Sequence, residues 1–271
     1  MPELPEVETV TTGLNFAIKN LIVKKVHVNR YDLRIKVSNE ITSVLNNLKV
    51  IAVKRRAKFG IIHFENEYSV VFHLGMSGSL RIIEHDEPPR KHDHYDFILN
   101  NGIALRYRDP RRFGSLLWAK EPLKHKLLSK LGPEPLEEEF TGTYLHSKAK
   151  SRKITIKQFI MNAYVVVGVG NIYASESLFL SGINPKRMAS RVSKKRMTAL
   201  VKAIKIILKK AIDAGGTTLR DFHNSDGSEG YFKIKLNVYD KKNKPCPNCN
   251  SAIRLIVIGQ RSTYYCVNCQ T

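Results

Sequence analysis

Cysteine is absent from the first 245 residues of this 271-residue chain, and all four cysteines lie near its end, at Cys246, Cys249, Cys266 and Cys269. A fold held together by disulfides distributes its cysteines along the chain, so this clustering argues against a disulfide scaffold. It indicates instead a metal site in a reducing compartment. Two disulfides or four free thiols are the alternative states of these side chains.

The sequence also lacks any uncharged apolar run of about 18 residues, the length that a transmembrane helix needs. The first ten residues, MPELPEVETV, contain three glutamates and no lysine or arginine. A signal peptide has a basic segment followed by an apolar one, so this start does not resemble a signal peptide. Both absences predict a cytoplasmic protein without a membrane partner.

Acidic residues are scarce relative to basic ones. The chain has 24 Asp and Glu against 45 Lys and Arg, which gives a formal net charge of +21. Such a surplus favours a polyanionic partner, because each phosphate that a basic side chain neutralises releases condensed counterions. We favour nucleic acid as that partner, although a ribosomal protein or a protein bound to anionic membranes has the same charge signature.

Short β-favouring runs, separated by turn-prone residues such as Asn-Asn-Gly and Asp-Pro, dominate residues 1–130. They occupy residues 23–28, 50–56, 60–65, 68–75, 95–100, 103–108 and 115–120. Strands spaced this closely predict an antiparallel sandwich. A helix is expected ahead of them over residues 3–19, because apolar side chains recur there on one helical face. These side chains are Val7, Val10, Leu14 and Ile18.

The character of the sequence changes after residue 130. The motif LGPEP at 131–135, followed by three glutamates, predicts a linker over 131–148. Helical patterns then occupy residues 154–163, 171–182 and 193–214, and short strands return at 253–258 and 262–266. The sequence therefore predicts an α+β fold, with a strand-rich N-terminal part and a helix-rich C-terminal part.

The four cysteines form two CxxC motifs, CPNC and CVNC, with sixteen residues between them. This spacing is typical of a zinc ribbon, in which a β-hairpin brings two knuckles together around one ion. Four thiolates at about 2.3 Å leave no coordination position for water, so one structural Zn²⁺ is predicted. The same hairpin carries basic residues, among them Arg254 and Arg261, that suit backbone phosphates; an ordinary solvated tip is the alternative.

Position 2 is a proline, and removal of the initiator Met1 would leave Pro2 with a free secondary amine. An α-amino group titrates near 7.7 to 8.0, so a useful fraction is unprotonated at neutral pH. Such an amine can attack C1′ of a deoxyribose and form an iminium. Glu3 and Glu6, one helical turn apart, could move protons or stabilise a cationic sugar. Taken alone, these residues are better explained as an ordinary helix start, where proline is common and glutamate favours the helix dipole.

Seven features of the chain, in this order, resemble the formamidopyrimidine-DNA glycosylase family (Fpg, also called MutM). They are MPELPEVETV at the N-terminus, KHDH at 91–94, DPRRFG at 109–114, LGPEP at 131–135, GVGNIYASE at 168–176, GGTTL at 215–219 and the terminal zinc ribbon. The resemblance spans essentially the whole chain, and several of the motifs are long and unusual.

The resemblance implies catalytic roles for particular residues. Pro2 matches the family's nucleophile, Glu3 the acid that assists departure of the base, and Glu6 a helix carboxylate that supports the site. Lys58 matches a lysine that contacts the DNA phosphate and helps the chemistry. Arg261 matches the arginine of the zinc hairpin that grips phosphates beside the lesion, so it joins Pro2, Glu3 and Lys58 as a candidate catalytic residue.

The resemblance also implies DNA contacts. The family's phosphate-binding residues match His92, Arg112, Lys157 and Asn171. Asn171 is expected at a helix N-terminus, where exposed amides seat a phosphate, and a simple N-cap is the alternative. Glu176 matches a glutamate of structural character, and segment 217–232 matches the loop that covers the everted base.

Met76, Arg111 and Phe113 match the three side chains that fill the gap when a base leaves the stack. Removing a base from the stack costs a few kcal/mol. Apolar wedges offset part of that cost, and an arginine can hydrogen-bond the orphaned partner base. Taken singly, Met76 and Phe113 would be interpreted as core residues and Arg111 as a turn residue.

The fold implied by the resemblance has a β-sandwich with flanking helices in its N-terminal domain, residues 1–130. A linker (131–148) leads to a helical domain with a helix–two-turn–helix element (149–236) and a β-hairpin zinc finger (237–271). The implied protein is a monomeric, cytoplasmic bacterial enzyme that associates with the nucleoid when it acts. No redox cofactor or catalytic metal is expected.

The implied activity is that of a bifunctional DNA glycosylase and abasic-site lyase of base excision repair. It excises oxidised purines, 8-oxoguanine and formamidopyrimidines, from double-stranded DNA through a Schiff base on Pro2, and then cleaves the strand by β,δ-elimination. One alternative is a glycosylase of the endonuclease VIII type for oxidised pyrimidines, although that group usually begins MPEGPE and this chain has Leu4. Another is a non-catalytic zinc-ribbon DNA-binding protein.

Overall fold

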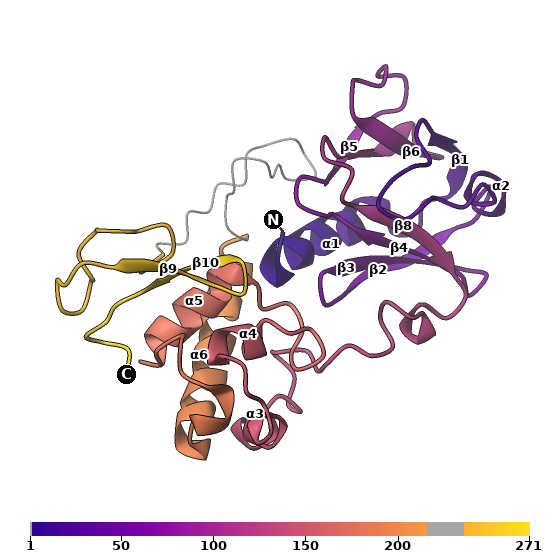
Figure 1. Ribbon diagram of the computed structural model, residues 1–271. Helices are drawn as coiled ribbons and strands as arrows, with labels where there is room; N and C mark the ends of the chain where they lie inside the picture. The colour runs from indigo at the N-terminus through magenta and orange to yellow at the C-terminus, as the bar shows by residue number, and fades with distance from the viewer. Residues whose placement is uncertain (1, 216–235) are drawn as a thin grey trace. The chain divides into compact units, whose positions relative to one another are not determined.

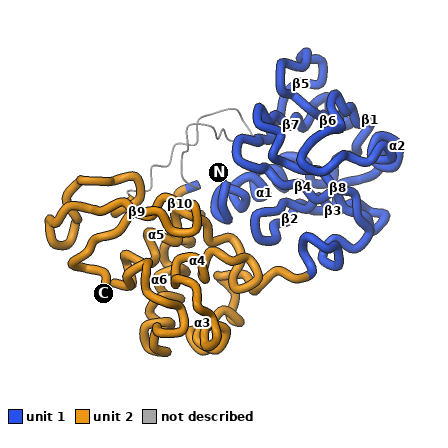
Figure 2. Tube along the Cα trace, viewed as in Figure 1, with its two compact units in different colours: residues 1–129, 215–232 blue, residues 130–214, 233–271 orange. Residues whose placement is uncertain are grey.

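The computed structural model describes residues 2–215 and 236–271. The chain divides into two compact units, one of residues 1–129 with 215–232 and one of residues 130–214 with 233–271 (Figure 2). The segment expected to cover the everted base, 217–232, lies outside the described residues. Among the helices in the described ranges, none is long and apolar enough to span a bilayer.

Unit 1 begins with helix α1 (Leu4–Ile18), which confirms the helix expected over residues 3–19. Its four predicted core residues are at most 2% exposed, because their spacing of three to four residues puts them on one face. The helix packs on strand β2 (Val50–Arg56), where Asn15 Oδ1 accepts the N–H of Val53 at 2.8 Å (Figure 1).

Two four-stranded antiparallel sheets form the rest of unit 1. The first has the order β1-β6-β7-β5, and its strands are β1 (Val23–Val28), β6 (Asp93–Leu99), β7 (Ile103–Arg108) and β5 (Ser79–Glu84). The second has the order β2-β3-β4-β8, with β3 (Phe59–Phe64), β4 (Ser69–His73) and β8 (Ser115–Ala119) beside β2. Side chains of both sheets and of α1 share one apolar core, which confirms the predicted sandwich.

All seven predicted strands are present, and β5 is the strand that the sequence pattern missed. β5 lies at the edge of its sheet, and only its first two residues are buried. An edge strand that is half exposed lacks the alternation that marks a strand with one buried face. Two short segments, α2 (Ile41–Val44) and the 3-10 turn Pro122–Lys124, complete the described part of unit 1.

Unit 2 is helical, with a β-hairpin near the end of the chain (Figure 1). Its elements are α3 (Gly142–Ala149), α4 (Ile156–Ile160), α5 (Asn171–Leu180), the 3-10 turn Ala189–Arg191, α6 (Lys194–Asp213), β9 (Arg254–Ile258) and β10 (Arg261–Tyr265). Helix α3 corrects the expected linker over 131–148, because it begins inside that range and packs against α6. The acidic and glycine–proline composition ahead of α3 concealed its start, where Thr141 accepts the N–H of Tyr144 as an N-cap.

Candidate nucleic-acid interface and metal centre

The start of α1 brings three candidate catalytic or supporting residues together. Pro2 is buried, and Glu3 and Glu6 are 2% and 1% exposed. The backbone N–H of Glu3 donates to Glu6 Oε2 at 2.7 Å, so the Glu6 carboxylate fixes the backbone directly after Pro2. A carboxylate at this place also interacts favourably with the positive end of the helix. This contact supports a positioning role for Glu6.

The turn between β2 and β3 carries Lys58 and is tied to the first half of α1. Arg55 forms an ion pair with Glu8, in the second turn of α1. The same guanidinium donates to the carbonyl of Ala57 at 3.1 Å, so it holds the residue before Lys58. Ala57 itself has a φ of +57°, a backbone conformation that a tight two-residue connection requires. Arg55 thus ties the turn that carries Lys58 to α1.

His73 lies next to Lys58 and was not singled out from the sequence. Its ring contacts Phe59, the residue after Lys58, with 4.9 Å between ring centroids, and its Nδ1 accepts the N–H of Gly75 at 3.0 Å. Burial, together with the positive charges of Lys58 and Arg34, lowers the pKa of His73 to about 4. His73 is therefore neutral at pH 7, and it links the Lys58 turn to the loop that carries Met76.

Acidification is expected to destabilise the protein through His73. Its pKa of about 4 in the folded state lies below the ordinary value of 6.5, so the unfolded state binds more protons between these limits. Stability should fall as the pH drops through this window. Lowering the pH from 7.5 to 5.5 should cost about 1 kcal/mol through this residue. Urea unfolding at both pH values should show this loss in the wild type but not in His73→Asn, which has no titrating ring. The exposed His85→Asn control should lose as much stability between these pH values as the wild type does. Equal losses in all three proteins would contradict the assignment.

The motif DPRRFG forms a tight turn between β7 and β8. The N–H of Arg112 donates to the carbonyl of Asp109 at 3.2 Å, and the N–H of Arg111 donates to Asp109 Oδ1 at 3.2 Å. Aspartate at the first position and proline at the second are the residues that favour this type of turn. Arg112 follows with a φ of +56°. The turn projects Arg111, Arg112 and Phe113 into solvent.

The candidate gap-filling residues are surface residues. Phe113 is 42% exposed, and the guanidinium carbon of Arg111 lies 4.8 Å from the centre of its ring. Met76 is half-buried and lies outside the apolar core of the sandwich. The interpretation of Met76 and Phe113 as core residues therefore fails. Exposed apolar and aromatic side chains at a loop tip are what a wedge between bases requires.

The loop of Met76 lies directly against the loop of Phe113. Gly75 precedes Met76 with a φ of +67°, and a Cβ atom added to it would lie 2.5 Å from the backbone of Phe113 and Gly114. Only glycine allows this close approach. His92 is also tied to the same place, because its carbonyl accepts the N–H of Asp109 at 3.0 Å. All five sequence-predicted residues of these loops therefore gather at one edge of the sandwich.

Unit 2 gathers its three candidate DNA contacts at the start of β10. Lys157, from α4, donates from Nζ to the carbonyl of Ser262 at 3.0 Å and to Thr263 Oγ1 at 2.7 Å. Asn171 donates from Nδ2 to the same Ser262 carbonyl at 3.0 Å. Arg261 is the exposed neighbour of Ser262. Asn171 is the first residue of α5, and Gly170 occupies the N-cap position.

Lys157, which the resemblance matches to a phosphate contact, is only 1% exposed. Its ammonium group fastens the hairpin and places a positive charge directly beneath Ser262. The sequence could not predict that Lys157 contacts the hairpin, because its two partners lie more than 100 residues away along the chain. The exposed positive charge at this place comes from Arg261.

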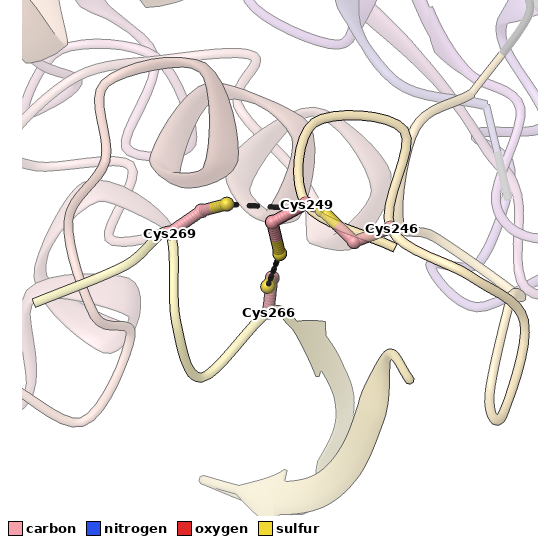
Figure 3. Close-up of side chains that lie close together, drawn as sticks. All are labelled: Cys246, Cys249, Cys266 and Cys269. Atoms are coloured by element: carbon pink, nitrogen blue, oxygen red, sulfur yellow. Dashed lines mark hydrogen bonds between the residues drawn. The ribbon is translucent and has the colours of Figure 1, made fainter. Parts of the chain in front are cut away.

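The four cysteines converge at the end of unit 2 (Figure 3). Their sulfur atoms all lie within 4.8 Å of one another, with 3.8 Å between Cys246 and Cys269 and 3.4 Å between Cys249 and Cys266. A tetrahedron of thiolates around Zn²⁺ has sulfur atoms about 3.8 Å apart, so the cluster fits one structural Zn²⁺.

Glu176 connects α5 to the start of the zinc-finger segment. It is 1% exposed, and its carboxylate accepts four hydrogen bonds of 2.8 to 2.9 Å, from the backbone N–H groups of Asn237, Val238 and Tyr239 and from Asn237 Nδ2. A buried carboxylate with this many donors is a fixed structural element. The geometry agrees with the structural character expected for Glu176.

Family models match almost the whole chain. The formamidopyrimidine-DNA glycosylase N-terminal domain matches residues 1–116, and the H2TH domain of the same enzymes matches residues 131–223. The zinc finger found in FPG and IleRS matches residues 243–271. The three models follow one another in the order expected from the sequence motifs.

Relatives with this domain order cover the chain from end to end. The chain is 50% identical over 270 residues to the formamidopyrimidine-DNA glycosylase of Histophilus somni, a match that covers 100% of this chain and 99% of the relative. It is 49% identical over 271 residues to that of Hydrogenovibrio crunogenus, with coverage of 100% and 96%.

Solved structures with the same fold include a complex of Lactococcus lactis Fpg with DNA containing Fapy-dG. That structure has a TM-score of 0.90 at 30% identity and covers 99% of both chains. The MutM protein of Thermus thermophilus has a TM-score of 0.87 at 31% identity, and the match covers 99% of this chain and 98% of that chain. The motifs, the cluster of four cysteines and these full-length matches together show that the chain belongs to the formamidopyrimidine-DNA glycosylase family.

Proposed function

We propose that the protein is a DNA glycosylase and abasic-site lyase of base excision repair that removes oxidised purines from duplex DNA as a monomer, with the Pro2 amine as nucleophile. The observation that carries this proposal is the start of α1, where the buried Glu3 and Glu6 flank the backbone next to Pro2. The two carboxylates cap α1, and in a chain of this family their burial beside an N-terminal amine also suits an amine nucleophile with an acid next to it.

The proposed reaction uses the amine in two stages. The nitrogen of Pro2, freed by removal of Met1, attacks C1′ of the everted nucleotide as the bond to the damaged base breaks, and Glu3 supplies a proton that assists base departure and sugar-ring opening. The product is an iminium between Pro2 and the sugar. Loss of a proton from C2′ then breaks the bond to the 3′ phosphate, and a second elimination breaks the bond to the 5′ phosphate. A one-nucleotide gap with phosphate ends remains.

Residues on the described surface are suited to bind duplex DNA from which one base is everted. Met76, Arg111 and Phe113 enter the gap left by the everted base, and Lys58, His92 and Arg112 contact phosphates from unit 1. Arg261 and Asn171 contact phosphates from unit 2, and the buried ammonium of Lys157 strengthens the positive potential there. While it acts, the protein is associated with nucleoid DNA.

Oxidised pyrimidines are the second candidate substrate, because one observation favours them. A solved complex of Lactococcus lactis Fpg, 30% identical to this chain, holds DNA that contains an oxidized pyrimidine. We place oxidised purines first, since other complexes of the same relative hold Fapy-dG DNA and the sequence begins MPELPE.

Borohydride trapping tests the proposed function. The protein is incubated with duplexes that carry 8-oxoguanine, a formamidopyrimidine or an oxidised pyrimidine, and borohydride then reduces any iminium to a stable amine. We expect a covalent protein–DNA adduct that mass spectrometry maps to Pro2, formed fastest with the purine lesions. Faster trapping with the pyrimidine duplex would favour the second candidate. The absence of any adduct, from protein that starts at Pro2 and binds DNA, would leave only the non-catalytic DNA-binding protein.

A further inference from the structure

Asp109 is the most completely buried acidic residue among the described residues, with no exposed surface. Its carboxylate accepts four hydrogen bonds. Oδ1 accepts from Ser77 Oγ at 2.7 Å and from the N–H of Arg111 at 3.2 Å, and Oδ2 accepts from Tyr107 at 3.1 Å and from the N–H of Gly114 at 2.8 Å. A carboxylate surrounded in this way has one fixed orientation, because turning it would break charge-assisted hydrogen bonds.

The four donors come from two separate loops and from the sheet beneath them. Arg111 and Gly114 belong to the loop 109–114, and Ser77 belongs to the loop 74–78 that carries Met76. We call these the two recognition loops. The bond from Ser77 to Asp109 is a side-chain link between them, and the close approach of Gly75 to the Phe113 backbone reinforces it. The position of Met76 relative to Phe113 therefore depends on Asp109.

The sheet side of this network is equally constrained. The ring of Tyr107 stacks on Tyr95 with 4.7 Å between centroids and an interplanar angle of 12°. Its hydroxyl group leaves no space for a side chain at Gly114, because a Cβ atom there would lie 1.7 Å from the Tyr107 oxygen. His94 Nε2 lies 2.7 Å from the Asp109 carbonyl oxygen. Asp109 thus couples both recognition loops to the core of the sandwich.

We propose that Asp109 is a positioning residue, which holds the two recognition loops as one rigid unit so that Met76, Arg111 and Phe113 enter the DNA together. The inference rests on the proposed function, because it assigns a cause to the placement of the gap-filling side chains. Asp109 touches neither the DNA nor the reacting atoms, since it has no exposed surface.

A wedge that is already rigid is expected to insert faster than a flexible one. A wedge that must be ordered on binding loses conformational entropy at that step, whereas a wedge already held in place does not. A displacement of about 1 Å at such a site can lower a rate by about 100-fold. Weakening the network should therefore slow base eversion, while the phosphate contacts that set affinity remain.

Three variants separate positioning from general stability. Asp109→Asn replaces one acceptor oxygen with a donor amide, and Ser77→Ala removes only the link between the recognition loops. Ser69→Ala is the matched control, because Ser69 is a buried serine of β4 that bonds His63 Nδ1 at 2.9 Å and contacts neither loop. Each variant is measured with a duplex that holds 8-oxoguanine next to 2-aminopurine, whose fluorescence rises when the stack opens.

We expect Ser77→Ala to slow the fluorescence rise and 8-oxoguanine excision by about 3- to 10-fold, and Asp109→Asn by about 10- to 100-fold. Cleavage of a duplex with a preformed abasic site should change by less than about 2-fold, because extrusion costs least where no paired base must leave the stack. The concentration for half-maximal binding should also stay within about 2-fold. In a Met76→Ala background, Ser77→Ala should lower the excision rate little further, since both changes act on the same wedge.

Several results would overturn the proposal. Equal losses on the 8-oxoguanine and abasic duplexes, an equal loss in Ser69→Ala, or wild-type rates in Ser77→Ala would each reduce Asp109 to a structural residue. Failure of the proposed function is distinguishable, because the wild-type protein would then fail to excise 8-oxoguanine. The fluorescence change still reports insertion of the wedge in that case, since it requires no bond cleavage.

Discussion

Insertion of one glycine between Met1 and Pro2 is expected to abolish both base excision and strand cleavage, with rates at least about 1,000-fold lower. After the insertion, the Pro2 nitrogen lies in a peptide bond and has no free electron pair for attack on C1′. The new terminal amine lies one residue further from Glu3 and Glu6, so it misses the geometry that those buried carboxylates fix. Single-turnover cleavage of 8-oxoguanine duplex and borohydride trapping measure the loss.

Pro5→Ala is the matched control for this insertion. Pro5 is also a buried proline at the start of α1, but its nitrogen lies inside the chain and takes no part in the chemistry. The control should keep trapping within a few-fold of wild type, and both variants should bind lesion duplex with wild-type affinity. An inserted variant that still forms an adduct at the wild-type rate would show that another amine, such as that of Lys58, is the nucleophile.

The fold was predictable from the sequence where periodicity marks burial. The runs at Val23–Val28, Val50–Arg56 and Ile103–Arg108 coincide with strands residue for residue, because apolar and β-branched side chains face a shared core. β5 and α3 were not predicted, because no such periodicity marks them in the sequence. β5 is a half-exposed edge strand, and α3 follows an acidic segment and owes its start to the cap at Thr141.

Much of the candidate site was accessible from motifs, and the contacts that organise it were not. DPRRFG predicts a turn by its own chemistry, since aspartate and proline favour that backbone. The partners of Asp109 that lie outside the turn, Ser77 and Tyr107, come from other segments, and no spacing rule connects Ser77 to Asp109 across 32 residues. Lys157 shows the same limit, because this buried lysine bonds Thr263 of the zinc hairpin, which lies 106 residues away along the chain.

Removal of the zinc ion is expected to abolish DNA binding by unit 2 while unit 1 stays folded. The apolar cluster around the finger is small, with Phe179, Val238 and Ile253 beside two of the cysteines, so folding of this segment depends on the metal. Structural Zn²⁺ contributes about 10–16 kcal/mol to such segments. Cys266→Ala should eliminate the bound zinc and lower affinity for lesion duplex by about 100-fold or more, because the phosphate contacts of the hairpin are lost.

Asn268→Ala is the matched control, because Asn268 belongs to the same CVNC knuckle and donates to Ser251 Oγ at 2.7 Å without binding the metal. It should retain one zinc per chain and bind DNA within about 2-fold of wild type. In Cys266→Ala, the hairpin partners of Lys157 and Asn171 are no longer held in place, so Arg261 loses its defined position beside them. Unit 1 has a core of its own and should keep its strand signal in circular dichroism. Wild-type affinity in zinc-free protein, measured by metal analysis and fluorescence anisotropy, would show that the hairpin takes no part in binding.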